Sequence, residues 1–381
     1  MTYTVMATAP LGLEAVVARE VKQLGYECRV LNGKVIYQTD GLGIARSNLW
    51  LRCADRVLII VGEFVAHTFE ELFEQTKTLP WTDLLPQNAR FPVEGRSVKS
   101  QLSSVPACQS IVKKAIVTSM QERYAQEWLE ESGDLYAIEV SILNDVVTLT
   151  LDTSGPGLHK RGYRTEMGPA PIKETLAAAL VLLSRWQAHR PFADPLCGSG
   201  TIAIEAAMIA RHVAPGINRG FSAENFAFLP KDSFQLAREE ARDALLPQGT
   251  QPILASDIDS SAVAMARQHA TKAGVFDSIT FSVEPIATFF TKLDYGCIVT
   301  NPPYGERLSD ELTVRQLYKE MGQAARRLPT WSFFIITAHP AFERLFGKQA
   351  DKNRKLYNGR IECHFYQYLG PLPKREKPVT T

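Results

Sequence analysis

The strongest constraint on the fold is a regular alternation of apolar strands and helices in the second half of the chain. Strands are predicted at 192–196, 252–256, 279–283, 297–300, 332–337 and 364–369, with helices at 201–210 and 261–273. Alternation of this kind forms a mostly parallel sheet with helices on both faces. We therefore predict an α/β domain that starts near residue 172 and occupies the rest of the chain.

The first half of the chain has the pattern of two smaller α+β units. The first is predicted from strands at 3–7 and 34–39 with a helix at 13–24 between them. The second begins with a strand at 57–61 and ends with two alternating strands around Asn144-Asp145, a typical hairpin turn. Residues 152–164, with three glycines and one proline, have the composition of a linker.

Composition narrows the cellular setting and the possible partners. The chain has 42 basic and 41 acidic residues, so a polyanionic partner must be bound by local patches of charge. Six scattered cysteines without a C-x-x-C pair indicate neither a zinc site nor a disulfide framework. Since neither a signal peptide nor a membrane-spanning segment is recognisable, we expect a soluble cytoplasmic protein.

A glycine turn, Asp194-Pro-Leu-Cys-Gly-Ser-Gly-Thr201, lies between a predicted strand and a predicted helix. Gly198 and Gly200 would let the backbone approach a nucleotide-like cofactor at the helix N-terminus. The turn is neither a phosphate loop nor a G-x-G-x-x-G motif, because Ala203 stands at the third glycine position. A turn of this kind can also be only a tight connection.

Two acids follow the next predicted strand, where carboxylates commonly accept hydrogen bonds from ribose hydroxyls. They are Asp257 and Asp259. Their distance from the glycine turn exceeds the usual spacing of about 20 residues by roughly 40, so an insertion is predicted around 214–246. Asp259 could equally be the N-cap of the helix predicted at 261–273.

The most specific motif is Asn301-Pro-Pro-Tyr304, directly after the apolar strand at 297–300. The prolines remove backbone donors, which leaves the Asn301 side chain and the Pro302 carbonyl as acceptors. Two acceptors match the two N–H groups of an exocyclic amine, so alignment and polarisation would replace a strong base. Tyr304 would stack on an unstacked base. Alone, the motif could be a rigid turn, but its place two strands after the glycine turn favours function.

Several further segments, together with both motifs, resemble one known family. They are 91–93, 99–104, 109–115, 152–155, 158–164 and 301–307. Over nearly its whole length the chain resembles class I RNA methyltransferases fused to a THUMP domain. The match is closest to the bacterial branch related to the N-terminal half of the 23S ribosomal RNA guanine-N2 methyltransferase (RlmL-like).

The resemblance implies four parts: a ferredoxin-like unit at 1–56, a THUMP RNA-binding domain at 57–152, a linker at 153–171 and a Rossmann-like methyltransferase domain at 172–381. It implies S-adenosyl-L-methionine as cofactor and the exocyclic N2 of a guanine in 23S ribosomal RNA as methyl acceptor. RNA is then the expected partner, with no membrane and no metal; oligomeric state is not predicted.

The resemblance also implies the site residues. The catalytic motif is Asn301, Pro302, Pro303 and Tyr304. Residues expected to bind the cofactor are Lys173, Glu174, Thr175, Asp194, Pro195, Gly198, Ser199, Gly200, Thr201, Asp257, Ile258, Asp259 and Glu284. Many members of the family place an acid after the third strand to bind the adenine amino group. This chain departs from that pattern with Phe281-Ser-Val-Glu-Pro285, which leaves Glu284 as the only candidate.

Basic side chains predicted to contact RNA phosphates form two groups. The first is Lys99, Lys113, Lys114, His159, Lys160, Arg161 and Arg164, and the second is Lys348, Lys352, Arg354 and Lys355. A cluster such as the one at 90–114 can also be a solvated helix face with serine-rich turns.

Three alternatives remain at this stage. The same chemistry could act on transfer RNA. A DNA adenine-N6 methyltransferase shares the Asn-Pro-Pro-Tyr motif, but the first 150 residues resemble THUMP rather than a DNA-reading domain. A non-catalytic RNA-binding or ribosome-assembly factor could keep the fold, although both motifs are intact.

Overall fold

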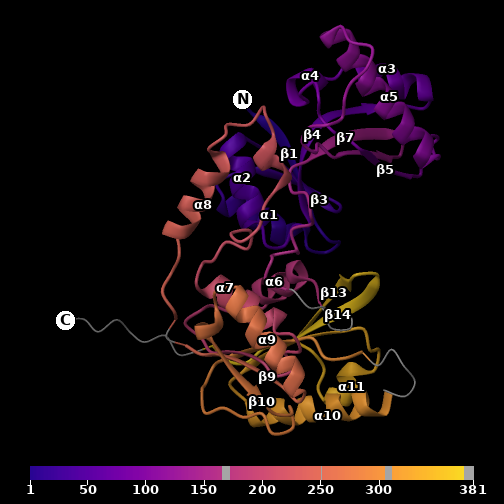
Figure 1. Ribbon diagram of the computed structural model, residues 1–381. Helices are drawn as coiled ribbons and strands as arrows, with labels where there is room; N and C mark the ends of the chain where they lie inside the picture. Colours follow the sequence, from indigo (N-terminus) through magenta and orange to yellow (C-terminus); the bar gives the residue numbers. More distant parts are fainter. Residues whose placement is uncertain (165–171, 250, 305–310, 373–381) are drawn as a thin grey trace. The chain divides into compact units, whose positions relative to one another are not determined.

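The computed structural model describes residues 1–164, 172–249, 251–304 and 311–372. It divides into two compact units, each with a seven-stranded sheet (Figure 1). Unit 1 contains Met1–Pro10, Val17–Leu158 and Arg219–Ala241, and unit 2 contains Leu11–Val16, His159–Asn218 and Arg242–Thr381. Residues 165–171 of the predicted linker lie outside the described residues.

The sheet of unit 1 has the strand order β2-β3-β1-β4-β7-β6-β5. Its strands are β1 (Tyr3–Thr8), β2 (Cys28–Leu31), β3 (Lys34–Thr39), β4 (Arg56–Val65), β5 (Val93–Val98), β6 (Ile138–Leu143) and β7 (Val146–Asp152). All neighbouring strands pair antiparallel except β5 and β6, which are parallel. Val5, Ala7 and Val35 are fully buried, whereas their neighbours Thr4, Thr8 and Lys34 are partly exposed. Helices therefore cover one face of this sheet.

Two of the helices described in unit 1 begin with a capping side chain. The helices between residues 1 and 158 are α1 (Glu14–Gln23), α2 (Gly41–Trp50), α3 (Phe69–Lys77), α4 (Trp81–Leu84) and α5 (Val105–Tyr124). The Asp40 side chain accepts from the Gly43 amide (2.8 Å) to start α2, and Thr68 accepts from Glu71 (3.1 Å) to start α3.

Unit 2 contains the α/β sheet expected from the strand and helix alternation. Its order is β10-β9-β8-β11-β12-β14-β13. The strands are β8 (Phe192–Asp194), β9 (Ile253–Asp257), β10 (Ile279–Val283), β11 (Cys297–Thr300), β12 (Ser332–Thr337), β13 (Lys352–Asn358) and β14 (Ile361–Tyr368). The first five in this order are parallel, and β14 and β13 add an antiparallel hairpin, so the predicted fold class is confirmed.

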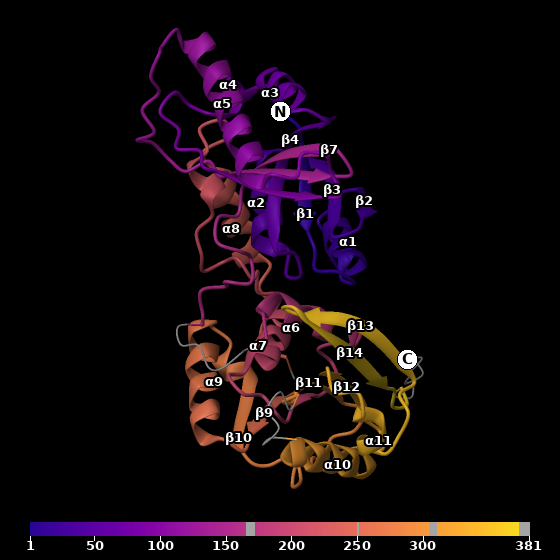
Figure 2. The ribbon, with the colours of Figure 1, turned by 90° about the vertical axis from the view of Figure 1, so that its right-hand side faces the viewer.

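Helices cover both faces of this sheet (Figure 2). They are α6 (Glu174–Leu183), α7 (Thr201–Ala210), α9 (Ser260–Lys272), α10 (Glu311–Arg327) and α11 (Phe342–Phe346). Val314 and Tyr318 of α10 and Phe342 of α11 pack in one core with Ile298 and Phe333 of the sheet. Helices α7 and α9 contact β8, β9 and β10 instead.

The predicted insertion belongs largely to unit 1. Its segment Arg219–Ala241, with η1 (Ser222–Asn225) and most of α8 (Ser233–Asp243), is grouped with residues 1–158. Phe226 stacks on Tyr136 with ring centroids 4.5 Å apart, the Ala227 amide donates to the Tyr136 hydroxyl (3.0 Å), and Arg46 pairs with Glu240 (2.5 Å). The sequence placed this stretch in the domain at 172–381, and its contacts group it with unit 1. No helix in the described parts of the chain has the length and apolarity needed to cross a bilayer.

Candidate active site

The two motifs meet at one edge of the sheet in unit 2. Strand β8 lies between β9 and β11 and is parallel to both. The carboxyl ends of the three strands, at Asp194, Asp257 and Thr300, therefore share the edge where ligands bind in open α/β sheets. Chain order separates these residues, and only the strand order brings them together.

The glycine turn is fixed to the end of β9 by one carboxylate. The Gly198 amide donates to Asp257 Oδ2 (2.8 Å), and the Asp259 amide donates to Asp257 Oδ1 (3.0 Å). Gly200 caps α7 with φ 81°, a left-handed conformation that favours glycine. A Cβ on Gly198 would meet no atom within 4 Å, so the backbone there borders open space.

Asp194 acts as a brace between the two motifs. It is buried and accepts from Thr300 Oγ1 (2.7 Å), the residue directly before Asn301. Burial raises the pKa of Asp194 to about 7, against the lowering effect of the Thr300 hydrogen bond. The carboxyl group therefore ties β8 to β11 from inside the sheet.

The remaining predicted cofactor residues differ in their hydrogen bonds and in their exposure. Asp259 caps α9 by accepting from the Ser261 amide (2.8 Å), which is the capping interpretation left open above. Glu284 Oε1 accepts from Ser282 Oγ (2.7 Å) just after β10. Ile258 leaves 69% of its surface exposed, an apolar surface that a flat ring could cover. Lys173 is exposed at the start of α6, whereas Pro195 is buried in the turn.

Two buried oxygens test whether a cofactor fits this edge. Glu174 and Thr175 open α6 and are almost fully buried. Within the described residues, Glu174 Oε2 and Thr175 Oγ1 have no hydrogen-bond partner. Buried polar atoms without a partner are rare in folded proteins. A ligand that carries N–H donors would satisfy them, so the residues present fit the amino-acid part of the expected cofactor.

The Asn-Pro-Pro-Tyr loop is held in place by hydroxyl groups. The Tyr304 hydroxyl donates to Asn301 Oδ1 (2.6 Å) and accepts from Asn358 Nδ2 (3.3 Å) at the end of β13. The Tyr318 hydroxyl of α10 donates to the Pro303 carbonyl (2.8 Å) and lies 2.8 Å from Thr337 Oγ1. Burial raises the pKa of Tyr304 well above its usual range, so the hydroxyl keeps its proton. The segment 301–307 was one of those that resemble the family, and its residues 305–307 lie outside the described residues.

Family models match the chain in three consecutive parts. An RlmL ferredoxin-like domain matches residues 4–58, a THUMP domain matches 66–152, and an RMKL-like methyltransferase domain matches 161–367. The Bacillus subtilis (strain 168) protein named "Putative RNA methyltransferase YpsC" is 53% identical over 378 residues, which are 98% of each chain. The chain belongs to the RlmL-like THUMP methyltransferases.

Two solved structures support this family assignment of the methyltransferase. The Listeria monocytogenes str. 4b F2365 protein, described as "a predicted N6-adenine-specific DNA methylase", is 55% identical, covers 97% of each chain and has a TM-score of 0.94. SMU.472, described as "a putative methyltransferase complexed with SAH", is 45% identical over 99% of each chain with a TM-score of 0.93. S-adenosyl-L-methionine is therefore the cofactor of this methyltransferase.

The linker of the methyltransferase contributes two arginines to the interior of unit 2. Arg161 is 3% exposed, and its guanidinium pairs with Glu205 of α7 (3.4 Å), which also accepts from the Tyr163 hydroxyl (3.3 Å). Arg164 donates to Thr201 Oγ1 (2.6 Å) at the start of α7. The sequence predicted that both arginines contact RNA; the burial of Arg161 contradicts this, whereas Arg164 is only half-buried and its RNA contact stays a prediction.

The other predicted RNA-contact residues of the methyltransferase differ in exposure. Lys99 and Lys160 are exposed, whereas Lys113 Nζ donates to the Phe91 carbonyl (3.0 Å), pairs with Glu131 (2.5 Å) and lies 3.6 Å from the Phe91 ring centroid. Lys113 is therefore engaged in holding unit 1 together. Lys114 lies over the Phe73 ring and His159 is partly exposed. In the second group, Lys348 and Lys352 are exposed, Lys355 pairs with Glu362 (2.6 Å), and Arg354 donates to the Gly12 carbonyl (2.7 Å).

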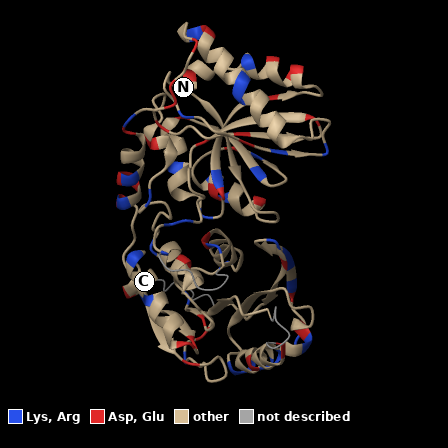
Figure 3. Cartoon of the chain, turned by 45° about the vertical axis from the view of Figure 1, so that its right-hand side comes forward, with Lys and Arg blue, Asp and Glu red and all other residues tan. Residues whose placement is uncertain are grey.

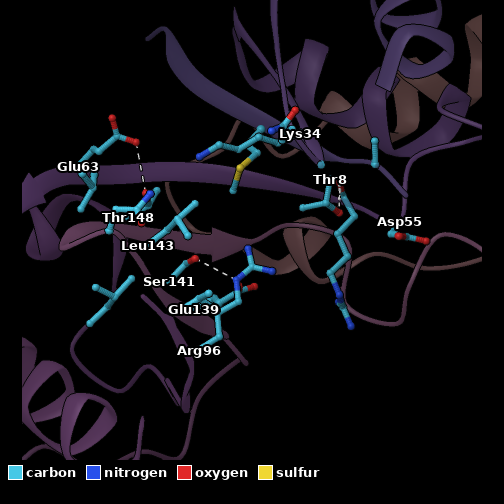
Figure 4. Close-up of a pocket in the computed structure, with 18 residues that line it drawn as sticks. Thr8, Lys34, Asp55, Glu63, Arg96, Glu139, Ser141, Leu143 and Thr148 are labelled. Atoms are coloured by element: carbon cyan, nitrogen blue, oxygen red, sulfur yellow. Dashed lines mark hydrogen bonds and ion pairs between the residues drawn. The ribbon is translucent and has the colours of Figure 1, made fainter. Parts of the chain in front are cut away.

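The uncovered face of the sheet in unit 1 forms a groove of about 760 Å³ (Figure 4). Its lining includes three basic and three acidic residues, Lys34, Arg56, Arg96, Asp55, Glu63 and Glu139. Arg96 pairs with Glu139 (3.1 Å), and Glu63 accepts from Thr148 (3.2 Å). Because the charges balance, this groove does not favour phosphate binding, in keeping with the interspersed charges in Figure 3.

Among the described residues, no group of three or more His, Cys, Asp or Glu side chains could hold a metal ion. The six cysteines are unpaired. Sequence reasoning missed Thr300, Tyr318, Thr337 and Asn358. Thr300 could have been suspected because it adjoins the motif, but the other three are distant in sequence and carry no local signal.

Proposed function

We propose that this methyltransferase transfers a methyl group from S-adenosyl-L-methionine to the exocyclic N2 of a guanine in 23S ribosomal RNA. The observation that carries the proposal is the position of the Asn301 amide and the Pro302 carbonyl beside the glycine turn at one sheet edge. The family assignment supports an RNA substrate, and the resemblance to the guanine-N2 branch supports the choice of base.

For methyl transfer, the protein mainly has to align the amino group of the base with the methyl group of the cofactor. The cofactor supplies an electrophilic methyl group on a positively charged sulfur. Asn301 and the Pro302 carbonyl accept hydrogen bonds from the two amino protons, which turns the nitrogen lone pair away from the ring and toward the methyl group. Transfer would form the N–C bond as the bond between the methyl group and sulfur breaks, which leaves S-adenosylhomocysteine, and the nitrogen would release one proton to water. The carboxyl group of Asp194 is buried beneath the site and braces it.

The contact between Tyr304 and Asn301 is compatible with this role. A carbonyl oxygen has two acceptor positions, so Asn301 Oδ1 can receive the Tyr304 hydroxyl (2.6 Å) and still receive the amine. We propose that Tyr304 fixes the amide so that its oxygen faces the base. The hydrogen bond involves only the hydroxyl, so stacking of the Tyr304 ring on the base stays a prediction.

RNA contacts in this proposal rest on exposed cations. We keep the exposed Lys99, Lys114, Lys160, Lys348, Lys352 and Lys355 and the partly exposed His159, and leave out Arg161, which is buried, and Arg164, which is half-buried and donates to Thr201. Contacts of this kind would position RNA through its backbone, and the base pocket would choose the nucleotide.

The test uses the purified chain and an Asn301→Ala variant with a radiolabelled methyl donor. The acceptors are naked 23S ribosomal RNA, bulk transfer RNA and genomic DNA from a strain that lacks the protein, followed by digestion and identification of the labelled nucleoside. N2-methylguanosine in ribosomal RNA, lost in the variant, is the expected result. Affinity of the variant for S-adenosylhomocysteine should stay at the wild-type level, which controls for folding.

Other outcomes change the proposal in defined ways. Label in transfer RNA would keep the chemistry and replace the substrate. Label as N6-methyladenine in DNA would contradict both base and nucleic acid, and would agree with the activity in the name of the Listeria protein. If the cofactor binds but no acceptor is labelled, a non-catalytic RNA-binding or assembly role replaces the enzyme.

A further inference from the structure

A histidine lies behind the Asn-Pro-Pro-Tyr loop, one side chain away from it. His339 follows the end of β12, which is parallel to β11, so it lies at the same sheet edge as Asn301. Its side chain is 7% exposed, and its ring is perpendicular to the Tyr318 ring, with centroids 5.3 Å apart. The Tyr318 hydroxyl in turn donates to the Pro303 carbonyl (2.8 Å).

His339 holds the carboxylate of Glu311, in the first turn of α10. Its Nδ1 accepts from the Ala341 amide (3.1 Å), so the ring carries its proton on Nε2, which lies 3.4 Å from Glu311 Oε1. Arg315, one turn further along α10, lies 3.8 Å from the same oxygen. Within the described residues both contacts of Glu311 use Oε1, and its side chain is 40% exposed. Oε2 is therefore available to a ligand that arrives from solvent.

The negative charge of Glu311 acts on the hydroxyl that holds the loop. Burial raises the pKa of Tyr318 above its usual range, and the charge of Glu311 adds to this rise. Because that hydroxyl donates to the Pro303 carbonyl, the carboxylate lies near the loop that is proposed to bind the exocyclic amine. Glu311 therefore adds a charged hydrogen-bond acceptor to the two acceptors of the loop.

The two acceptors of the Asn-Pro-Pro-Tyr loop do not distinguish one base from another. The exocyclic amines of guanine, adenine and cytosine each offer two N–H donors. The ring nitrogen beside the amine differs, because N1 of guanine carries a hydrogen, whereas N1 of adenine and N3 of cytosine carry a lone pair. A carboxylate accepts a hydrogen bond from the first and repels the other two.

We propose that Glu311 Oε2 accepts the N1–H of the target guanine and thereby selects guanine over adenine and cytosine. This inference rests on the proposed function, since it concerns the same base at the same site. His339 and Arg315 are positioning residues, because they hold the other carboxylate oxygen and fix its orientation. A site built to accept a hydrogen bond rejects an analogue that cannot donate it, since the acceptor then stays unpaired.

The experiment replaces the target guanosine with 2-aminopurine riboside in a synthetic RNA that carries the sequence labelled by the wild type. This base keeps the 2-amino group but has a lone pair at N1. Wild-type kcat/KM should favour guanosine roughly 10- to 100-fold. Glu311→Gln should reduce this preference about 10-fold, because its amide can turn to donate to the lone pair. The missing O6 of 2-aminopurine affects both proteins alike, so the change in preference reports the contact at N1.

The matched control is Glu320→Gln on the same helix, where the carboxylate accepts from Gln316 Nε2 (2.9 Å). It should keep the wild-type preference. Glu311→Ala should also reduce the preference, because it removes the acceptor, so the test does not depend on a single variant. Affinity for S-adenosylhomocysteine should stay at the wild-type level in all three variants, which controls for folding.

The outcomes separate this inference from the proposed function. If the wild type methylates guanine and both Glu311 variants keep its preference for guanosine over 2-aminopurine, the inference is wrong and the proposed function stands. Label on adenine or cytosine, or on no guanine in any nucleic acid tested, would overturn the proposed function and the inference with it.

Discussion

At the scale of single residues, the site depends on buried side chains that hold its backbone in place. Asp194 and Tyr318 both hold the Asn-Pro-Pro-Tyr segment, through hydrogen bonds with Thr300 Oγ1 (2.7 Å) and the Pro303 carbonyl (2.8 Å). Each makes a hydrogen bond in a buried setting, where loss of one partner leaves the other group unsatisfied. Substitutions at these residues should therefore separate stability from cofactor binding.

Asp194→Asn should change how stability depends on pH. In the folded protein the pKa of Asp194 is about 7, against an ordinary value of 3.8, so the native state holds this proton more tightly than the unfolded state. The stability it contributes is present below about pH 4 and is lost as pH rises through 7. Between pH 4 and pH 8, the free energy of unfolding of the variant should rise relative to that of the wild type by on the order of a few kcal/mol.

Urea unfolding of both proteins without cofactor, at several pH values across that window, measures this difference. Asparagine keeps an oxygen that can accept from Thr300, so the brace itself persists in the variant. A difference in unfolding free energy that stays constant with pH would contradict the prediction.

Tyr318→Phe should slow methyl transfer without changing cofactor affinity. The variant removes the hydroxyl that positions the Pro303 carbonyl, and a loop misplaced by about 1 Å can cost about 100-fold in rate. We expect kcat to fall by about 10-fold or more and the free energy of unfolding to decrease by about 1 kcal/mol. Tyr368→Phe is the matched control, because it removes a hydroxyl in the same core that donates to the Lys348 carbonyl. Equal rates for the two variants would refute the positioning role.

At the scale of elements, the glycine turn shows why two similar residues differ. Gly200 has φ 81°, and an added Cβ would lie 2.8 Å from the Ala266 Cβ on α9. Gly198 has φ 49° and open space around the same position. Backbone conformation strains both sites, but only the first also suffers a clash inside the fold.

Gly200→Ala should therefore lower thermal stability more than Gly198→Ala, which should cost about 1–2 kcal/mol. Gly198→Ala should instead weaken cofactor binding out of proportion to its stability loss, because the open space there faces the proposed ligand. Thermal unfolding and S-adenosylhomocysteine titration of both variants measure the two effects. The idea fails if the two variants lose stability and affinity in the same ratio.

The inserted segment is a second element whose role follows from its contacts. Phe226 is 3% exposed and stacks on Tyr136, so Phe226→Ala should destabilise unit 1 by about 3–5 kcal/mol. Cofactor affinity should stay unchanged, because the predicted cofactor residues belong to unit 2. Phe290→Ala, at a phenylalanine that is 59% exposed, is the control and should alter neither quantity. A loss of cofactor affinity in Phe226→Ala would contradict the prediction that this residue stabilises unit 1 without affecting cofactor binding in unit 2.

At the scale of the whole molecule, RNA binding must come from local charge, since 42 basic residues nearly balance 41 acidic ones. Exposed Lys99 and Lys160 should each contribute to the salt dependence of RNA affinity, while Lys113 is engaged by Phe91 and Glu131. The double variant Lys99→Ala/Lys160→Ala should weaken binding and reduce the slope of log affinity against log salt by about two.

Lys113→Ala should lower stability but leave that slope nearly unchanged. Filter binding at several salt concentrations, with thermal unfolding alongside, distinguishes the two variants. An unchanged slope in the double variant, or a slope reduced by one in Lys113→Ala, would show that the assignment of these lysines is wrong.

The sequence by itself determined the α/β sheet of unit 2, the glycine turn and the Asn-Pro-Pro-Tyr loop at its edge, because periodicity, caps and turn residues act over a few residues. It did not predict α2, which is buried on most sides and lacks a clear polar face, or β2, whose residues are largely exposed. Tertiary structure alone decided that Arg161 is buried against Glu205, that residues 219–241 contact unit 1, and that Tyr318 and Asn358 hold the Asn-Pro-Pro-Tyr loop. Each of these features depends on contacts with residues that are distant in the sequence. A local sequence pattern does not indicate which distant element a residue will contact.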